Sequence, residues 1–205
     1  MRQNDALEFL EVWLKNQTGQ VNLVVIAGGT CSGKSYLAGA INNYFGEGDV
    51  SVVQLDDYFK DLDDPTLPHD PSGYPIFDLP QSYHRRQINV DVAALLGGNP
   101  IDCPVYDIAS NRRTLTTRLI EARKIIVIDG LFSIDFLSHL KHLAIYVDTA
   151  DALRCERRIE RDATRFGVSE SIIREVFYAH LLPLHRKYVE PQRSKADILV
   201  EGNNG

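Results

Sequence analysis

The sequence of 205 residues has few cysteines, no long apolar run and no excess of basic charge. Its three cysteines (Cys31, Cys103 and Cys155) are odd in number and widely spaced, which disfavours a disulfide framework or a zinc site and favours a reducing compartment. No apolar stretch approaches the roughly 20 residues that span a bilayer, and the first residues lack the pattern of a signal peptide. We therefore expect a cytoplasmic protein that has no membrane partner.

The chain carries 22 basic and 28 acidic side chains, a formal net charge of −6 at pH 7. This balance disfavours nucleic acid as a partner, so a local cluster of positive groups would have to bind any anionic ligand. Hydrophobic residues make up 44% of the chain, enough for a real core, and no repeat or linker divides it. We expect a single domain over residues 1–205, and the sequence leaves a homo-oligomer open.

Short apolar runs rich in β-branched residues recur along the chain. They occupy residues 21–27, 50–55, 124–129, 143–148 and 196–200. Such runs are typical of strands that are buried on both faces of a parallel sheet. Helical patterns alternate with them at about 33–45, 81–97, 133–140, 150–165 and 169–188, and a further amphipathic helix is expected within 1–17. This alternation predicts an α/β fold: a doubly wound, mostly parallel five-stranded sheet with helices on both faces.

Two segments break the alternation. Residues 56–80 hold five prolines and the aromatic residues Tyr58, Phe59, Tyr74 and Phe77. Long connections in compact domains are usually functional or disordered, and the aromatic residues favour an ordered binding loop. Residues 99–118 are expected to form a small hairpin at the edge of the sheet.

A phosphate-binding motif, GxxxxGK[ST], follows the first predicted strand. Its residues are Gly28, Gly29, Thr30, Cys31, Ser32, Gly33, Lys34 and Ser35. Backbone N–H groups of such a loop and the N-terminus of the following helix attract phosphate oxygens. Lys34 is predicted to reach the β- and γ-phosphates, and the Ser35 hydroxyl to bind Mg²⁺. The alternative is a glycine-rich turn with an incidental lysine, and the strand before it and the helix after it argue against that interpretation.

Acidic residues stand where the predicted strands end, the edge at which open α/β sheets bind ligands. Asp56 and Asp57 follow the second strand, and Asp129 ends the third. Phosphoryl transfer to an alcohol needs a carboxylate near the hydroxyl and oxygen ligands for Mg²⁺. We predict Asp56 as the base and Asp129 as a magnesium ligand, although either could be a turn residue. Asp148, which precedes a predicted helix, favours an N-cap role.

Five arginines recur at helical spacing within residues 150–165. They are Arg154, Arg157, Arg158, Arg161 and Arg165. In isolation a solvated face, partly neutralised by Glu156, Glu160 and Asp162, would explain them better. Beside a phosphate-binding loop they favour a mobile lid that closes over the transferred group.

Taken together, the motifs between about residues 21 and 200 resemble the uridine kinase and phosphoribulokinase family of P-loop kinases. The resemblance implies a P-loop NTPase fold with a helical lid at 150–168, ATP and Mg²⁺ as cofactors, and a small-molecule phosphate acceptor. LDDYFKD (55–61) is similar to the segment that carries the family's catalytic base, which falls on Asp56. IFD (76–78) places the residue that binds ribose hydroxyls on Asp78, and PVYD (104–107) places a substrate-contacting tyrosine on Tyr106. The lid pattern puts the functional arginines on Arg158 and Arg161, and Arg158 is also expected to contact the acceptor.

Departures from the family pattern fall mostly on base recognition. Asn111 stands where the nucleoside kinases usually carry a histidine that contacts the base, and we expect it to contact the acceptor. Val176 replaces an expected glutamine, and Phe166 and Val168 replace later lid arginines. The segments that resemble the phosphate-binding and ribose-binding segments of the family are still present.

The sequence therefore predicts a kinase that moves the γ-phosphate of Mg·ATP to a hydroxyl of a ribose-containing acceptor, first of all uridine or cytidine. Lys34, Asp56, Arg158 and Arg161 are the predicted catalytic residues. The run DDYFK also resembles nicotinamide riboside kinases, which stay as the second interpretation, along with other small-metabolite kinases of the family. Two alternatives come from another class: a GTPase switch, which should carry an NKxD motif that is missing here, and a nucleotide-binding regulator without catalysis.

Overall fold

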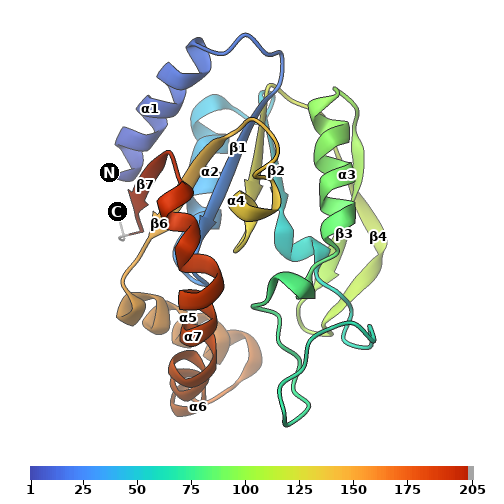
Figure 1. The fold of residues 1–205 in the computed structure, drawn as a ribbon, viewed down its shortest axis with the longest axis vertical. Coiled ribbons are helices and arrows are strands. Elements are labelled where there is room, and N and C mark those ends of the chain that lie inside the picture. Colours follow the sequence, from blue (N-terminus) through green and yellow to red (C-terminus); the bar gives the residue numbers. More distant parts are fainter. Residues whose placement is uncertain (203–205) are drawn as a thin grey trace.

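The computed structural model describes residues 1–202, and these contain one parallel sheet (Figure 1). Its strands are β1 (Asn22–Gly28), β2 (Val50–Gln54), β5 (Ile125–Asp129), β6 (Leu143–Asp148) and β7 (Ile198–Glu201). Their order is β2-β5-β1-β6-β7, and every neighbouring pair is parallel. All five predicted strands are confirmed, each within two residues of its predicted bounds at either end.

Helices cover both faces of this sheet, because successive side chains of each strand point to opposite faces. On one face, α1 (Gln3–Lys15) and α2 (Lys34–Phe45) pack against the even-numbered residues of β1, such as Val24. On the other face, α3 (Arg85–Leu96) and α4 (Ser133–Phe136) pack against odd-numbered residues such as Val25. The predicted doubly wound fold is thus confirmed.

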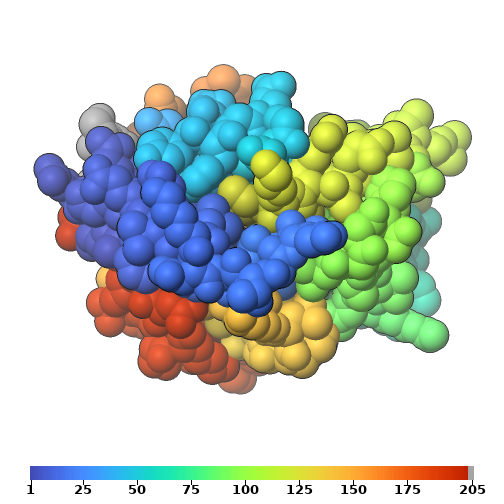
Figure 2. Space-filling view, turned by 90° about the horizontal axis from the view of Figure 1, so that it is seen from above, coloured from blue at the N-terminus to red at the C-terminus, as the bar shows by residue number. Residues whose placement is uncertain are grey.

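The remaining strands, β3 (Ile101–Asp107) and β4 (Arg112–Ile120), form an antiparallel hairpin that is a separate sheet. Ser51 of the edge strand β2 donates a hydrogen bond from Oγ to the carbonyl oxygen of Glu121, at 2.5 Å, which fixes the base of the hairpin beside that edge. Figure 2 shows the green α3 and this hairpin together at one end of the molecule. The hairpin expected within 99–118 is confirmed.

Residues 56–80 form the ordered loop that their aromatic content predicted. The loop begins with a 3₁₀ turn at Leu55–Tyr58 and is followed by another at Pro80–Ser82. Its two ends are joined by a backbone bond from Lys60 N to Ser82 O at 2.9 Å, and its tip by the bridge between His69 and Pro75. The 3₁₀ turn delays the following helix, so that α3 starts at Arg85 and not at residue 81.

The C-terminal helices differ from the predicted ones. The predicted lid helix, α5 (Asp151–Phe166), is capped by Gly167, whose φ of +65° suits glycine. The next helix is interrupted: α6 (Glu170–Val176) passes through π-helical turns on both sides of α7 (Leu182–Leu184). Pro183 lies in α7 and has no N–H to donate, which accounts for a disturbed helical ladder there.

Two further expectations are corrected. The N-cap of α5 is Ala150, while Asp148 accepts a hydrogen bond from Nε of Arg193 at 3.0 Å. The predicted helix at 133–140 ends at Phe136. Within residues 1–202, no helix is both long and apolar enough to cross a membrane.

Asp57 connects the hairpin to the main sheet. Its carboxylate is mostly buried and accepts one hydrogen bond from Nη2 of Arg118, at 2.9 Å, and one from the backbone N–H of Tyr106, at 3.2 Å. The two bonds reach both strands of the hairpin from the first turn after β2. They therefore set where the hairpin lies relative to the strand ends.

We predict that Asp57→Ala lowers the free energy of unfolding by about 1–3 kcal/mol, because it leaves a buried N–H and a guanidinium without their acceptor. Urea unfolding followed by circular dichroism measures this. Asp63→Ala is the matched control, since Asp63 makes an exposed pair with Arg112 and should cost less than about 0.5 kcal/mol. Equal losses in both variants would contradict the anchoring role of Asp57.

Candidate active site

The phosphate-binding loop connects β1 to α2 and needs unusual backbone angles at three positions. Gly28 has a φ of +149°, Gly33 of +102°, and Cys31, which is not a glycine, of +58°. Non-glycine residues seldom adopt positive φ, and such conformations concentrate at ligand-binding loops. The turn ends where α2 begins at Lys34, so that the positive end of the helix faces the loop.

Gly29 is a point of close packing behind this loop. A Cβ atom at Gly29 would overlap the guanidinium of Arg154 and press on the ring of His185. The Arg154 side chain is 1% exposed, pairs with Asp151 at 2.7 Å and lies over the ring of Phe177. Arg154 therefore supports the loop from behind and is not one of the lid arginines that face the cleft.

Ser35 and Asp129, which the sequence predicts as magnesium ligands, lie in contact near the ends of β1 and β5. Ser35 Oγ lies 2.5 Å from Asp129 Oδ2, while the buried Asp129 Oδ1 has no hydrogen-bond partner within residues 1–202. Burial raises the pKa of Asp129, and the charge of Lys34 and the hydrogen bond from Ser35 oppose that shift. A hydroxyl and a carboxylate oxygen with a spare lone pair suit Mg²⁺, which typically takes few protein ligands and completes its shell with phosphates and water. The residues present therefore fit this metal.

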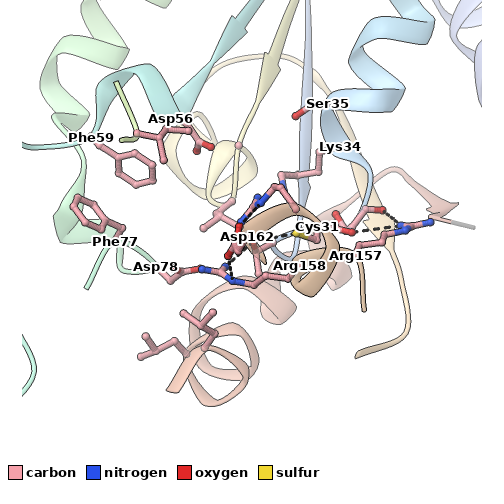
Figure 3. A pocket seen from close by; sticks show the side chains of 18 of the residues that line it. Cys31, Lys34, Ser35, Asp56, Phe59, Phe77, Asp78, Arg157, Arg158 and Asp162 are labelled. Carbon is pink, nitrogen blue, oxygen red and sulfur yellow. Dashed lines mark hydrogen bonds and ion pairs between the residues drawn. The ribbon is translucent and has the colours of Figure 1, made fainter. Parts of the chain in front are cut away.

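Asp56 and Asp57 have separate environments, although they are neighbours in sequence. Asp57 bonds to the hairpin, whereas Asp56 lines the same cleft as Lys34 (Figure 3). Water reaches the Asp56 carboxylate, yet the surrounding walls desolvate it, and together with the charges of Asp129 and Asp78 they raise its pKa to about 6 despite the opposing charges of Lys34 and Arg161. This is the value expected of a carboxylate that accepts a proton near neutral pH.

The cleft has a volume of about 1520 Å³ and extends from the phosphate loop to the 56–80 loop and the hairpin. It exceeds the roughly 300–1,000 Å³ of a pocket for one small ligand and is therefore large enough for two. An aromatic wall lines its far side: the ring of Phe59 lies 5.3 Å from that of Phe77 and 5.6 Å from that of Tyr106. Asp78 lies beside this wall (Figure 3).

The structure brings the predicted acceptor residues Asp78, Tyr106 and Asn111 to the same cleft. The hydroxyl of Tyr106 donates to the carbonyl oxygen of Lys60 at 3.3 Å, so its ring is what faces the cleft. Asn111 has a φ of +52° at the hairpin turn, and its carbonyl oxygen accepts a hydrogen bond from the N–H of Leu62. A turn requirement therefore accounts for asparagine at this position, in addition to any contact with an acceptor.

Four of the five arginines of α5 line the cleft: Arg157, Arg158, Arg161 and Arg165. Arg158 Nη1 lies 3.1 Å from Oγ1 of Thr30, and Arg157 Nη1 lies 3.4 Å from the carbonyl oxygen of Cys31, so both reach the phosphate loop. Apolar side chains continue this wall, among them Phe166 and Val176. Asp162, which the sequence indicates only as a charge that partly neutralises the arginines, is buried and bonded to two of them. No feature of the sequence distinguishes it from the neighbouring acidic residues.

The parallel sheet, the phosphate loop between β1 and α2, and the acidic strand ends define a P-loop protein. The chain belongs to the phosphoribulokinase / uridine kinase family, whose model matches residues 23–204. It is therefore a P-loop kinase. Kinases of this family use ATP, usually with Mg²⁺.

Curated relatives agree with this placement. The chain is 32% identical over 182 residues to a uridine kinase of Chloroflexus aggregans, covering 88% of this chain and 86% of that one. It is 31% identical to a uridine kinase of Halobacterium salinarum, covering 87% of this chain and 80% of that one.

Solved structures share the fold. A candidate fructose transport system kinase from Silicibacter sp. TM1040 superposes with a TM-score of 0.79 at 18% identity, covering 98% of each chain. A possible uridine kinase from Bacillus stearothermophilus gives 0.69 at 16% identity, covering 98% of this chain and 100% of that one.

The raised pKa of Asp56 predicts a pH-dependent stability difference. Because the folded protein disfavours the ionised form, wild type loses stability as the pH rises from about 4 to about 6, and Asp56→Asn does not. We expect the variant to melt at a higher temperature than wild type at pH 8, and the difference to shrink towards zero at pH 4. Scanning calorimetry of the ligand-free protein measures this. A lower melting temperature for the variant at pH 8 would show that the carboxylate is not destabilised.

Proposed function

We propose that this kinase transfers the γ-phosphate of Mg·ATP to a primary hydroxyl of a small ribose-containing acceptor, with a nucleoside such as uridine or cytidine as the first candidate. The single observation that carries this proposal is the arrangement of Asp56 across one cleft from the phosphate loop, with Asp78 and an aromatic wall on the acceptor side. The curated relatives at about 30% identity, which are named uridine kinases, support the nucleoside.

The triphosphate would lie on residues 28–35, where backbone N–H groups and the N-terminus of α2 favour negative charge. Lys34 now bonds to the carbonyl oxygen of Gly29 at 3.0 Å and would turn to the β- and γ-phosphates. Ser35 and Asp129 would hold Mg²⁺, which, when bound, offsets the charge of the phosphates.

Asp56 would orient the acceptor hydroxyl and take its proton as the oxygen attacks the γ-phosphorus. At pH 7 a group with a pKa of about 6 is mostly ionised and can accept that proton. Arg158 and Arg161 would stabilise the charge that spreads over the transferring group, and closure of the lid at residues 150–168 would exclude water.

The acceptor would place its ribose hydroxyls on Asp78 and its ring against Phe59, Phe77 and Tyr106. An uncharged pyrimidine can stack on these rings. A pyridinium ring gains a cation–π attraction from the same wall, which is why nicotinamide riboside is the second candidate. The apolar Phe166 and Val176 in the cleft offer few polar groups to a base, and they favour this alternative.

A nucleotide-dependent switch without transfer would leave the acceptor unchanged. We expect ADP release from ATP only when a riboside is added, in a coupled assay with uridine, cytidine, nicotinamide riboside, pantothenate and sugar phosphates. No nucleotide cleavage with any acceptor would favour the regulator, and cleavage that is independent of every acceptor, or that is seen with GTP alone, would favour the GTPase.

We predict that Asp56→Asn lowers kcat on the order of a hundredfold or more, because no base remains near the hydroxyl. Its affinity for Mg·ATP, measured by titration calorimetry, should stay within about threefold of wild type. Asp63→Asn, an exposed change in the same loop, is the control and should keep full activity. Near-normal turnover of Asp56→Asn would remove Asp56 from this role.

The proposed contact between Asp78 and the ribose hydroxyls predicts a preference for acceptors that carry these hydroxyls. Loss of hydrogen bonds to a carboxylate costs about 1.5–3 kcal/mol, so Asp78→Asn should lower kcat/KM for a riboside about 10- to 150-fold. The 2′,3′-dideoxy analogue, which has no hydroxyls to bind, should be used equally by both proteins. An equal loss on both substrates would show that Asp78 does not read the ribose.

A further inference from the structure

Two cleft-facing arginines share one carboxylate on their own helix. Asp162 Oδ2 lies 3.0 Å from Nε of Arg158, and Asp162 Oδ1 lies 2.7 Å from Nε of Arg161. Each oxygen therefore engages a different arginine, and Figure 3 shows Arg158 and Asp162 side by side at the cleft. This is a branched ion pair and not two independent surface contacts.

Burial distinguishes this carboxylate from the other acidic side chains of α5. The side chain of Asp162 is 10% exposed, while that of Glu156, which pairs with Arg174, is 57% exposed. Asp151 pairs with Arg154 behind the phosphate loop. Asp162 is thus a mostly buried carboxylate whose ion pairs go to two cleft-facing arginines.

When a carboxylate binds an arginine at Nε, the terminal nitrogen on the far side of the guanidinium is directed away from that carboxylate. Arg158 shows the result, since its Nη1 extends to Oγ1 of Thr30 in the phosphate loop at 3.1 Å. An unrestrained arginine side chain loses rotamer entropy when it meets the transferring group, and a side chain that is already held loses less. A fixed donor also needs no reorganisation at the moment of reaction.

We propose that Asp162 is a positioning residue, which holds Nε of Arg158 and of Arg161 so that both guanidinium groups face the phosphate loop before the substrates arrive. Asp162 itself touches neither the phosphates nor the acceptor. The shared carboxylate lowers the positive charge of this cluster, because one carboxylate beside two guanidinium groups leaves a net charge of +1. In return, both guanidinium groups are held in a defined direction.

The kinetic part of this inference rests on the proposed function and is tested with Asp162→Asn. The amide has the same shape, but its nitrogen cannot accept an N–H, so one of the two acceptor atoms that now engage the arginines is lost. We expect kcat to fall about tenfold or more, with KM for Mg·ATP and for the acceptor within about threefold of wild type. Glu156→Gln, which removes an exposed pair on the same helix, should leave kcat unchanged.

A double-mutant cycle separates positioning from a merely structural role. In an Arg161→Ala background, Asp162→Asn should lower kcat less than threefold, because one of the two partners is already gone. The same fold loss in both backgrounds, or a kcat for Asp162→Asn within twofold of wild type, would overturn the proposal.

A second measurement does not depend on turnover. In the ligand-free protein labelled with ¹⁵N-arginine, the Nε–H resonances of Arg158 and Arg161, assigned with the Lys variants, should be sharp and slow to exchange. We expect Asp162→Asn to broaden or shift at least one of them, and Glu156→Gln to leave both in place. If both resonances are unchanged in Asp162→Asn, the proposal is wrong. If wild type uses no acceptor, the proposed function fails by itself, and these spectra still decide the role of Asp162.

Discussion

The parallel register between β1 and β5 is the constraint on which the site depends. Ile26 pairs with Asp129, so β5 ends beside the last residues of β1, just before the phosphate loop begins. A slip of one residue would turn every side chain of the strand to the opposite face and separate Asp129 from Ser35. The buried apolar residues of both strands prevent that slip, and the contact at 2.5 Å between Ser35 and Asp129 is therefore held by the core.

The same sheet sets the electrostatics of the cleft. β2 pairs with β5 so that Gln54 lies opposite Asp129, which brings Asp56 to the same edge two residues later. The carboxylates of Asp56 and Asp129 repel each other, and Lys34 offsets part of this repulsion. Negative charge therefore comes from the rigid strand ends, and positive charge comes from the phosphate loop and the lid. A chain with a net charge of −6 can bind a polyphosphate because these positive groups are concentrated in one place.

The sequence predicted the parts of the fold whose signals are local. The five strands are continuous apolar runs, and the phosphate loop has its own spacing, so both could be read directly. The prediction of Asp56 as the base rests on its place after a strand and on the family pattern, and the structure adds a difference between the two neighbours: Asp57 is bonded to the hairpin. Features that depend on tertiary contacts could not be predicted from the sequence. Arg154 belonged to the same helical stripe as Arg158, yet it is packed behind Gly29. Asp148 looked like an N-cap because nothing in the sequence shows its bond to Arg193. The contact between Asn111 and the acceptor stays a prediction. The positive φ of Asn111 at the hairpin turn is a second, local reason for an asparagine at this position.

The predicted lid of this chain has fewer arginines than the family pattern, and two of them are held in place by Asp162. Phe166 and Val168 stand where the family pattern has further arginines, so less positive charge is available to the transferring phosphate. A smaller number of donors can be as effective if each is already directed, since an arginine that must search its rotamers contributes less in the transition state. The shared Asp162 supplies that direction at the cost of one negative charge, and it does so inside the helix, so the clamp would move with the lid as a unit. The arginine pair would then reach the phosphates with its geometry unchanged, and closure of the lid would only have to bring it near.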